Sequence, residues 1–126
     1  MKAAYVDTSC LVSVAFGEPG GAELARRLEG FDELFAANLL EAELRATFAR
    51  EVVPLDSTLL TWVTWVLPDR PLSREVTNVL SAGFLKGADL WHLACALYLV
   101  DTPRDIAFLT LDSRQGEVAE QLGFRP

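Results

Sequence analysis

Short, continuously apolar runs alternate along the chain with longer segments in which apolar residues recur at helical spacing. The apolar runs predict strands at 3–6, 33–37 and 106–111. Strands without polar alternation that are separated by helices are typical of a parallel sheet covered on both faces. The pattern therefore predicts an α/β fold with a central parallel sheet flanked by helices. In chain order, the predicted helices are 9–16, 22–28, 39–51, 56–66, one that begins at Ser73, 88–99 and 114–122.

The composition supports a folded protein and limits what it binds. The chain has 126 residues, which fits one domain, 1–126, and 51% of them are hydrophobic, enough to bury a core. Eighteen acidic residues against eleven Lys and Arg give a net charge of -7. This balance argues against a broad basic face that grips nucleic acid or an anionic membrane.

The sequence also predicts a cytoplasmic protein that does not enter a membrane. The longest nearly apolar stretch, Leu90–Val100, is too short to cross a bilayer. The N-terminal segment has a single Lys2 and an early Asp7, which makes it a poor secretory signal. Cys10 and Cys95 stand in apolar stretches without a CxxC pair, so we expect buried free thiols.

Three acidic residues stand where chain reversals are predicted. Asp7 directly follows the first strand, Asp112 directly follows the last one, and Asp89 lies at the start of a helix. Each has an ordinary structural explanation, since Asp is favourable as an N-cap and in the first turn of a helix. However, ligand sites of open parallel sheets lie at the carboxyl ends of the strands. The same positions therefore fit a binding site.

A fourth acid stands out on the helix predicted from Leu39. Glu41 has Arg45 four residues later, which makes an ordinary solvated pair. Glu43 has only uncharged helical neighbours, among them Leu39 and Leu40. A carboxylate beside an apolar face is costly to desolvate without a compensating charge. Glu43 is therefore the acid on this helix that needs a functional explanation.

If the four acids converge, their repulsion is severe unless a cation lies among them. Carboxylate and water oxygens are the ligands that Mg²⁺ and Mn²⁺ prefer. The constellation thus predicts a divalent metal site.

Four segments, YVDTS, LLEAELRA, GADLWHLACAL and FLTLDSRQ, carry a resemblance to the PIN-domain family, and most of all to VapC-type toxins of toxin–antitoxin modules. The resemblance covers essentially the whole chain, and the four acids stand in the family's order. It implies a three-layer fold and an endoribonuclease that cleaves RNA with metal-activated water, using Mg²⁺ or, as a substitute, Mn²⁺. It also implies a homodimer and an antitoxin protein that covers the active site. The implied metal-binding and catalytic acids are Asp7, Glu43, Asp89 and Asp112, supported by Ser9 and Thr110.

Basic and aromatic residues add further candidates. Arg45, Lys86 and Arg114 lie near the acidic motifs and are candidate RNA phosphate contacts, although ordinary surface solvation explains them equally well. We expect the single histidine, His92, to be a packed residue at the edge of the site rather than a general base, because a metal site does not need one. The predicted helix 56–66 is apolar nearly all round, which indicates a protein interface in addition to core.

Two other function classes remain open. A catalytically degenerate PIN-like module that only binds is compatible with the fold but does not explain why all four acids are present. A receiver-like signalling domain also combines a small α/β fold with strand-end acids and Mg²⁺. Such a domain needs a Lys at the end of a late strand, and both Lys2 and Lys86 are badly placed for that role.

Overall fold

A four-stranded, entirely parallel sheet forms the centre of the computed structural model, which describes residues 1–126. The strand order is β3-β2-β1-β4, so β1 is flanked on both sides and its carboxyl end lies in the middle of the sheet edge. In the register of the sheet, Ala4 lies beside Leu34 on one side and Ala107 on the other. The strands are β1 (Ala3–Val6), β2 (Glu33–Ala37), β3 (Thr64–Val66) and β4 (Ala107–Leu109).

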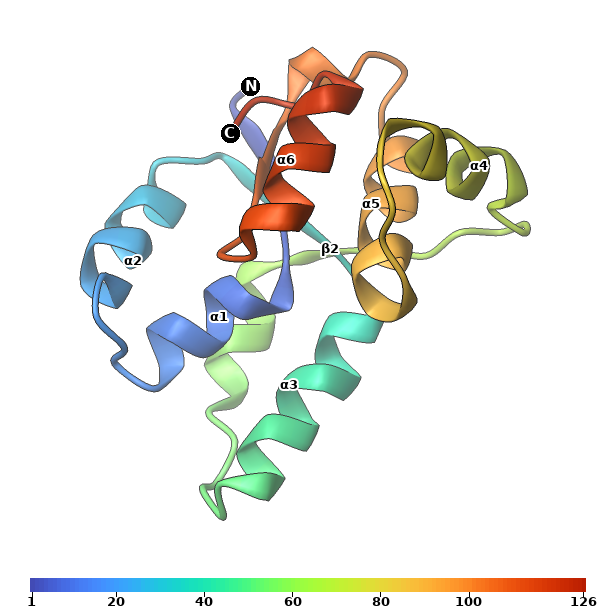
Figure 1. Cartoon of the computed structure of the whole chain (residues 1–126). Helices are drawn as coiled ribbons and strands as arrows, with labels where there is room; N and C mark the ends of the chain where they lie inside the picture. The colour runs from blue at the N-terminus through green and yellow to red at the C-terminus, as the bar shows by residue number, and fades with distance from the viewer.

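Helices cover both faces of this sheet and make three layers, as expected for a PIN-like fold. Figure 1 shows α4, α5 and α6 in the upper and right part of the molecule, with α1, α2 and α3 in the lower left part. Two short 3₁₀ helices, η1 (Ser57–Trp62) and η2 (Pro103–Asp105), lie in the connections. The α-helices are α1 (Thr8–Ala15), α2 (Gly21–Glu29), α3 (Leu39–Arg50), α4 (Ser73–Ala82), α5 (Gly87–Leu99) and α6 (Ser113–Leu122).

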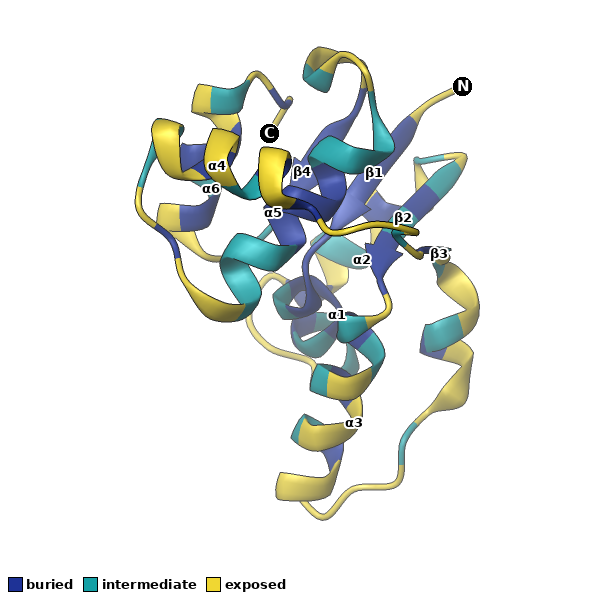
Figure 2. Ribbon diagram, turned by 90° about the vertical axis from the view of Figure 1, so that its right-hand side faces the viewer, coloured by how far each residue is buried: buried dark blue, intermediate teal, exposed yellow.

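The continuous apolar character of β1 follows from burial on both faces. Ala3 and Tyr5 join the core under α4, α5 and α6, whereas Ala4 and Val6 join the core under α1, α2 and α3. Because successive side chains of a strand point to opposite faces, a strand between two helical layers has no solvent-facing position. Figure 2 shows the strands buried at the centre, while the far end of α3 projects into solvent.

The helix predicted over 56–66 is wrong. The segment instead forms η1 and then β3, which pairs with β2 through Phe35 beside Thr64 and Ala37 beside Val66. The physical reason is the composition of its second half, because every residue from Trp62 to Val66 is β-branched or aromatic. Pairing with the exposed edge of β2 satisfies backbone groups that a short isolated helix leaves to water.

The remaining differences between the predicted and the observed elements are small. β4 is confined to 107–109 instead of 106–111, and beyond its end Leu111 is 55% exposed. The edge of β4 is covered by the segment after α6, where Phe108 N donates to Arg125 O and Arg125 N donates to Ile106 O.

None of the helices combines the length and the apolar character that a membrane crossing requires.

Both cysteines are free and buried, as the sequence predicted. Burial raises the pKa of Cys10 and of Cys95 to about 12.

The end of α3 carries a strained residue. Val53 N donates to Phe48 O at 3.0 Å and Val52 N donates to Ala49 O at 3.1 Å. The end of α6 has the same pair of bonds, and there Gly123 has a φ of 103°. At the equivalent position of α3, Val52 has a φ of 54°, a conformation that is unfavourable for a β-branched residue. Val52 is 88% exposed, so its side chain gains little from packing in return.

Replacing Val52 by glycine tests this strain. We expect Val52→Gly to raise the free energy of unfolding by about 1 kcal/mol, because glycine adopts positive φ without a Cβ clash. Val53→Gly is the matched control. It removes a half-buried side chain from a position without positive φ and lowers stability. Urea unfolding measures both changes, and a less stable Val52→Gly protein contradicts the assignment of strain.

Candidate active site

Two of the four predicted acids cap helices at the carboxyl edge of the sheet. Asp7 leaves β1 and accepts a hydrogen bond from Ser9 N at 3.2 Å, which makes it the N-cap of α1. Asp112 follows β4 and accepts from Gln115 N at 2.8 Å as the N-cap of α6. Both residues are therefore N-caps, which is the ordinary structural explanation given for them above. It does not exclude a second role, because capping places both carboxylates at the same edge.

Glu43 and Asp89 come from the two other helices that begin near this edge. Glu43 lies in the second turn of α3 and Asp89 in the first turn of α5. Burial raises the pKa of Asp89, and the negative charges of Asp7 and Asp112 raise it further. His92 opposes this shift, while Glu43 adds a smaller contribution in the same direction as the other acids. The other three acids thus lie within electrostatic reach of Asp89.

The acids are near each other but do not form a ready-made metal cage. No three carboxylate, histidine or cysteine side chains are placed closely enough to bind a metal ion as they stand. Asp7 is 6% exposed and held by hydrogen bonds, whereas Asp112 is exposed and Glu43 and Asp89 are half-buried.

Glu43 has two strong partners that lie far from it in the sequence. Its Oε1 accepts from Thr8 Oγ1 at 2.7 Å and lies 2.7 Å from His92 Nε2. Burial raises the pKa of Glu43, but the hydrogen bonds from His92 and Thr8 outweigh burial and lower the pKa overall. Glu43 is therefore ionised in the folded protein, and the compensation that its own helix lacks comes from α5 and α1.

His92 is fully buried, and Tyr5 Oη lies 2.7 Å from its Nδ1. The packed histidine expected from the sequence is what the structure contains. Its Nε2 also lies 3.4 Å from Thr8 Oγ1 and 3.8 Å from Asp7 Oδ1. The histidine thus joins the hydrophobic core to the acidic site.

Ser9 and Thr110 connect the acids to the neighbouring loops. Ser9 Oγ accepts from Leu111 N at 3.1 Å, which ties the start of α1 to the segment after β4. Thr110 Oγ1 donates to Gln115 Oε1 at 2.7 Å, accepts from Asp112 N at 3.1 Å and lies 3.4 Å from Asp7 Oδ2. The Thr110 hydroxyl therefore lies beside Asp7, whereas Ser9 contacts Asp7 through its backbone N–H.

Gln115 is a central residue that the sequence analysis missed. It is fully buried, and its Nε2 lies 3.4 Å from Asp7 Oδ1 and 3.2 Å from the carbonyl oxygen of Asp89. One signal in the sequence was available. Gln115 shares a helical face with Val118 and Ala119, and a polar residue on an apolar face is the pattern that singled out Glu43. Thr8 was also missed, and a hydroxyl between two other polar residues gives no comparable signal.

The three basic candidates stand apart from the acids. Arg45 pairs with Glu41 at 2.7 Å, and Arg114 lies 3.5 Å from Glu117. Lys86 is exposed at the N-terminus of α5. No ion pair joins any of them to the four acids, so all three positive charges face solvent.

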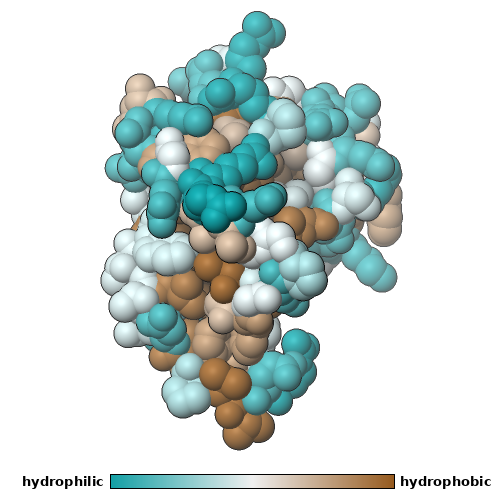
Figure 3. All heavy atoms as spheres, turned by 90° about the vertical axis from the view of Figure 1, so that its left-hand side faces the viewer, coloured by the Kyte–Doolittle hydropathy of each residue, from teal (hydrophilic) through white to brown (hydrophobic).

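A second surface feature is an apolar strip beside α1, the end of α3 and η1. One hollow of about 350 Å³ is lined by Val14, Phe48 and Val53 among others, and another of about 280 Å³ by Leu28 and Phe31 among others. Both are lined by Trp62, which is 40% exposed. Figure 3 shows apolar side chains running from the middle of this face to the tip of the molecule. The acids in the lining of the strip are Glu29, Asp32 and Asp56, and no basic residue lines it.

Comparison with protein families gives one match, in which the PIN domain model covers residues 4–121. The matched range contains the whole sheet and all four acids. Neither the curated proteins nor the solved structures include a match to this chain.

The electrostatic strain at Asp89 predicts a stabilising substitution. In metal-free buffer with EDTA, we expect Asp89→Asn to raise the melting temperature at pH 7, because the asparagine does not repel Asp7 and Asp112. The raised pKa means that the folded state binds the Asp89 proton more tightly than the unfolded state. Wild-type stability therefore falls as the pH rises from the unfolded to the folded pKa of Asp89. The stabilisation should therefore shrink below pH 4, where the carboxyl group is protonated. Thermal unfolding across pH measures it, and an equal effect at every pH contradicts the electrostatic cause.

Proposed function

Because this chain belongs to the PIN-domain family, we propose that it is a divalent-metal-dependent endoribonuclease, the toxin of a VapC-type toxin–antitoxin pair acting in the cytoplasm. Membership of the family indicates a nuclease that acts on nucleic acid. The observation that carries the proposal is that four acids lie near one sheet edge, where burial and the charges of the other three raise the pKa of Asp89. This match also argues against the receiver-like alternative.

The donor set fits a hard divalent cation. Carboxylate oxygens are the ligands that Mg²⁺ prefers, and Mn²⁺ is a plausible substitute. A cation among the acids offsets the repulsion that Asp89 experiences. Since no three ligands are in place, we propose that Asp89 and Asp112 turn toward Asp7, which is already fixed by Ser9 and Gln115. Glu43 either joins them as a ligand or holds the attacking water.

RNA hydrolysis needs an activated water and compensation of charge on the phosphate. A bound divalent cation lowers the pKa of water and offsets that charge. The protein contributes the orientation, since Glu43 stays ionised and retains an oxygen without a hydrogen bond, ready to accept from water. Arg45, Lys86 and Arg114 are exposed, so they remain the candidate contacts for flanking phosphates.

The apolar strip supports the proposal of a protein partner. An exposed Trp between two hollows is unusual for a surface that stays in water. Since the lining of the strip has acids and no bases, a segment with apolar and basic side chains complements it better than a second copy of the chain. We therefore assign the strip to the antitoxin. We propose that the homodimer uses another face. Light scattering should give the mass of two chains, and the mass of one chain contradicts the homodimer.

One observation favours a second candidate. The absence of three preplaced ligands is also what a degenerate, binding-only PIN module would have. The two candidates differ in whether added metal produces cleavage.

We expect the purified protein to cut RNA in the presence of Mg²⁺ or Mn²⁺ and to stop when EDTA is added. Glu43→Gln should lower the cleavage rate by about 100-fold or more, because the carboxylate needed at the site is lost. Glu41→Gln is the matched control, two residues away on the same helix, and should retain the rate. The readout is the loss of full-length RNA on a denaturing gel, with mapping of the new 5′ ends.

Cleavage that survives both EDTA and Glu43→Gln contradicts the metal-dependent mechanism. Metal-dependent RNA binding without any cleavage supports the binding module instead.

The toxin role predicts growth arrest in a host cell. Induced expression of the wild-type chain should stop growth within a few generations because cellular RNA is cut. Asp112→Asn should relieve the arrest while preserving the fold, since asparagine caps a helix about as well as aspartate. Culture density and immunoblots at matched expression measure the effect. Equal arrest by both proteins argues against the role of Asp112.

A further inference from the structure

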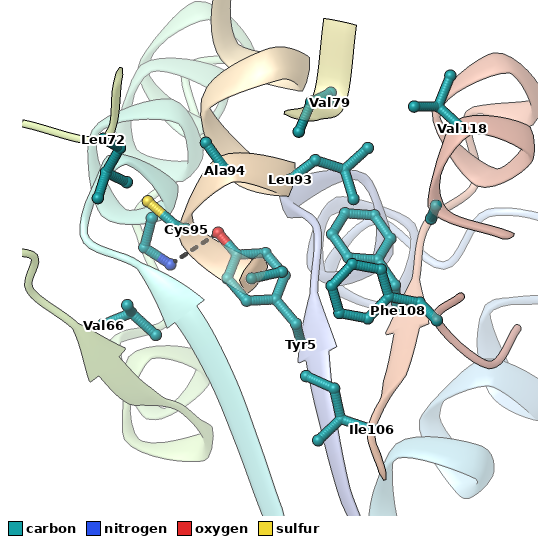
Figure 4. Close-up of a cluster of buried hydrophobic side chains, with 14 of the residues drawn as sticks. Tyr5, Val66, Leu72, Val79, Leu93, Ala94, Cys95, Ile106, Phe108 and Val118 are labelled. Carbon is teal, nitrogen blue, oxygen red and sulfur yellow. Dashed lines mark hydrogen bonds between the residues drawn. The ribbon is translucent and has the colours of Figure 1, made fainter. Parts of the chain in front are cut away.

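A chain of hydrogen bonds runs from the core of the sheet to the acidic edge. Ala37 N donates to Tyr5 Oη at 3.0 Å, and Tyr5 Oη lies 2.7 Å from His92 Nδ1. His92 Nε2 then lies 2.7 Å from Glu43 Oε1. Figure 4 shows Tyr5 in the core beside Leu93 and Phe108, with the bond to its hydroxyl dashed. Tyr5 and His92 are both fully buried, so water does not compete for their polar atoms.

The positions of the protons follow from what each partner can donate. Tyr5 Oη already accepts from Ala37 N. A phenol has an ordinary pKa of about 10, so it keeps its proton at pH 7. The nearest acceptor for that proton is His92 Nδ1. A proton on Nδ1 would leave the phenol hydrogen without an acceptor in the core. The opposite nitrogen, Nε2, faces the Glu43 carboxylate and must carry the hydrogen of the ring.

We propose that Tyr5 and His92 are positioning residues for Glu43. Tyr5 fixes the Nε2–H tautomer of His92, and His92 together with Thr8 holds Glu43 Oε1 and leaves Oε2 for the ligand of the acidic edge. The inference rests on the proposed function only in that this ligand is a divalent cation or the water beside it.

The geometry at Glu43 explains why two donors on one oxygen matter. Thr8 Oγ1 and His92 Nε2 both reach Oε1 at 2.7 Å, and no hydrogen bond is made to Oε2. A glutamate side chain rotates about three bonds, and it loses conformational freedom when it binds a ligand. The two donors restrict Glu43 before the ligand arrives, so that less ordering remains to be done on binding.

The tautomer is tested directly by NMR. The chain has one histidine, so its imidazole nitrogens give a single set of signals. In metal-free protein at pH 7, long-range ¹H–¹⁵N correlation should show a protonated Nε2 and an unprotonated Nδ1. Tyr5→Phe keeps the ring that stacks on Phe108 but removes the hydroxyl, and it should give a mixture of the two tautomers. A protonated Nδ1 in the wild type overturns the proposal.

The effect on the site is tested by Mn²⁺ binding, measured by titration calorimetry. Two substitutions of His92 form a matched pair. His92→Gln places an amide nitrogen close to the position of Nε2, whereas the side chain of His92→Asn reaches only the position of Nδ1. We expect His92→Asn and Tyr5→Phe to weaken Mn²⁺ binding by about tenfold or more, and His92→Gln to stay within about threefold of the wild type. Thermal unfolding confirms that the variants compared are folded.

The outcomes separate this inference from the proposed function. Equal Mn²⁺ affinity of folded His92→Asn and the wild type overturns the positioning role. Equal loss in His92→Gln and His92→Asn also overturns it, since the conservative variant then fails to restore the donor. A wild-type chain that binds no Mn²⁺ overturns both ideas. The predicted order of affinities without any RNA cleavage supports the positioning role and contradicts only the nuclease.

Discussion

Burial of β1 on both faces is the constraint on which the rest of the structure depends. A parallel strand in the middle of a sheet must have apolar side chains in both directions and must leave the sheet through a crossover. The first charged residue after the strand, Asp7, therefore stands at its carboxyl end. The helices that follow β1, β2 and β4 begin at the same edge and bring Glu43 and Asp112 there. The acidic edge is a direct result of how the sheet is covered.

The acids serve folding and the candidate site together. Asp7 and Asp112 satisfy backbone N–H groups at helix starts, which stabilises the fold. Asp89 does the reverse, because its raised pKa shows that its charged form is disfavoured where it stands. Glu43 lies between these cases, since it is desolvated but compensated by His92 and Thr8. Functional sites commonly lower the stability of the fold, here through repulsion among acidic side chains while no ligand is bound.

Most of the fold was predictable because it depends on local patterns. The apolar runs of β1, β2 and β4 and the spacing in α3, α5 and α6 are visible in single segments. β3 was not, since its three residues, Thr64, Trp65 and Val66, also fit a helix until β2 offers an edge to pair with. Within the site, Glu43 was recognisable as a polar residue on an apolar face. Its bond to His92 joins residues 49 positions apart, and no local pattern encodes such a pair.

The hydrogen bonds between Arg125 and β4 make the segment 124–125 part of the cover of the sheet. Arg125 occupies part of the open edge of β4, and Phe124 beside it is buried in the core under α6. Removing these two residues would uncover a strand edge, the kind of surface on which chains add to one another and aggregate. It would also loosen the strand from which Thr110 and Asp112 emerge. The durability of the acidic edge thus depends in part on a segment that contributes no side chain to it.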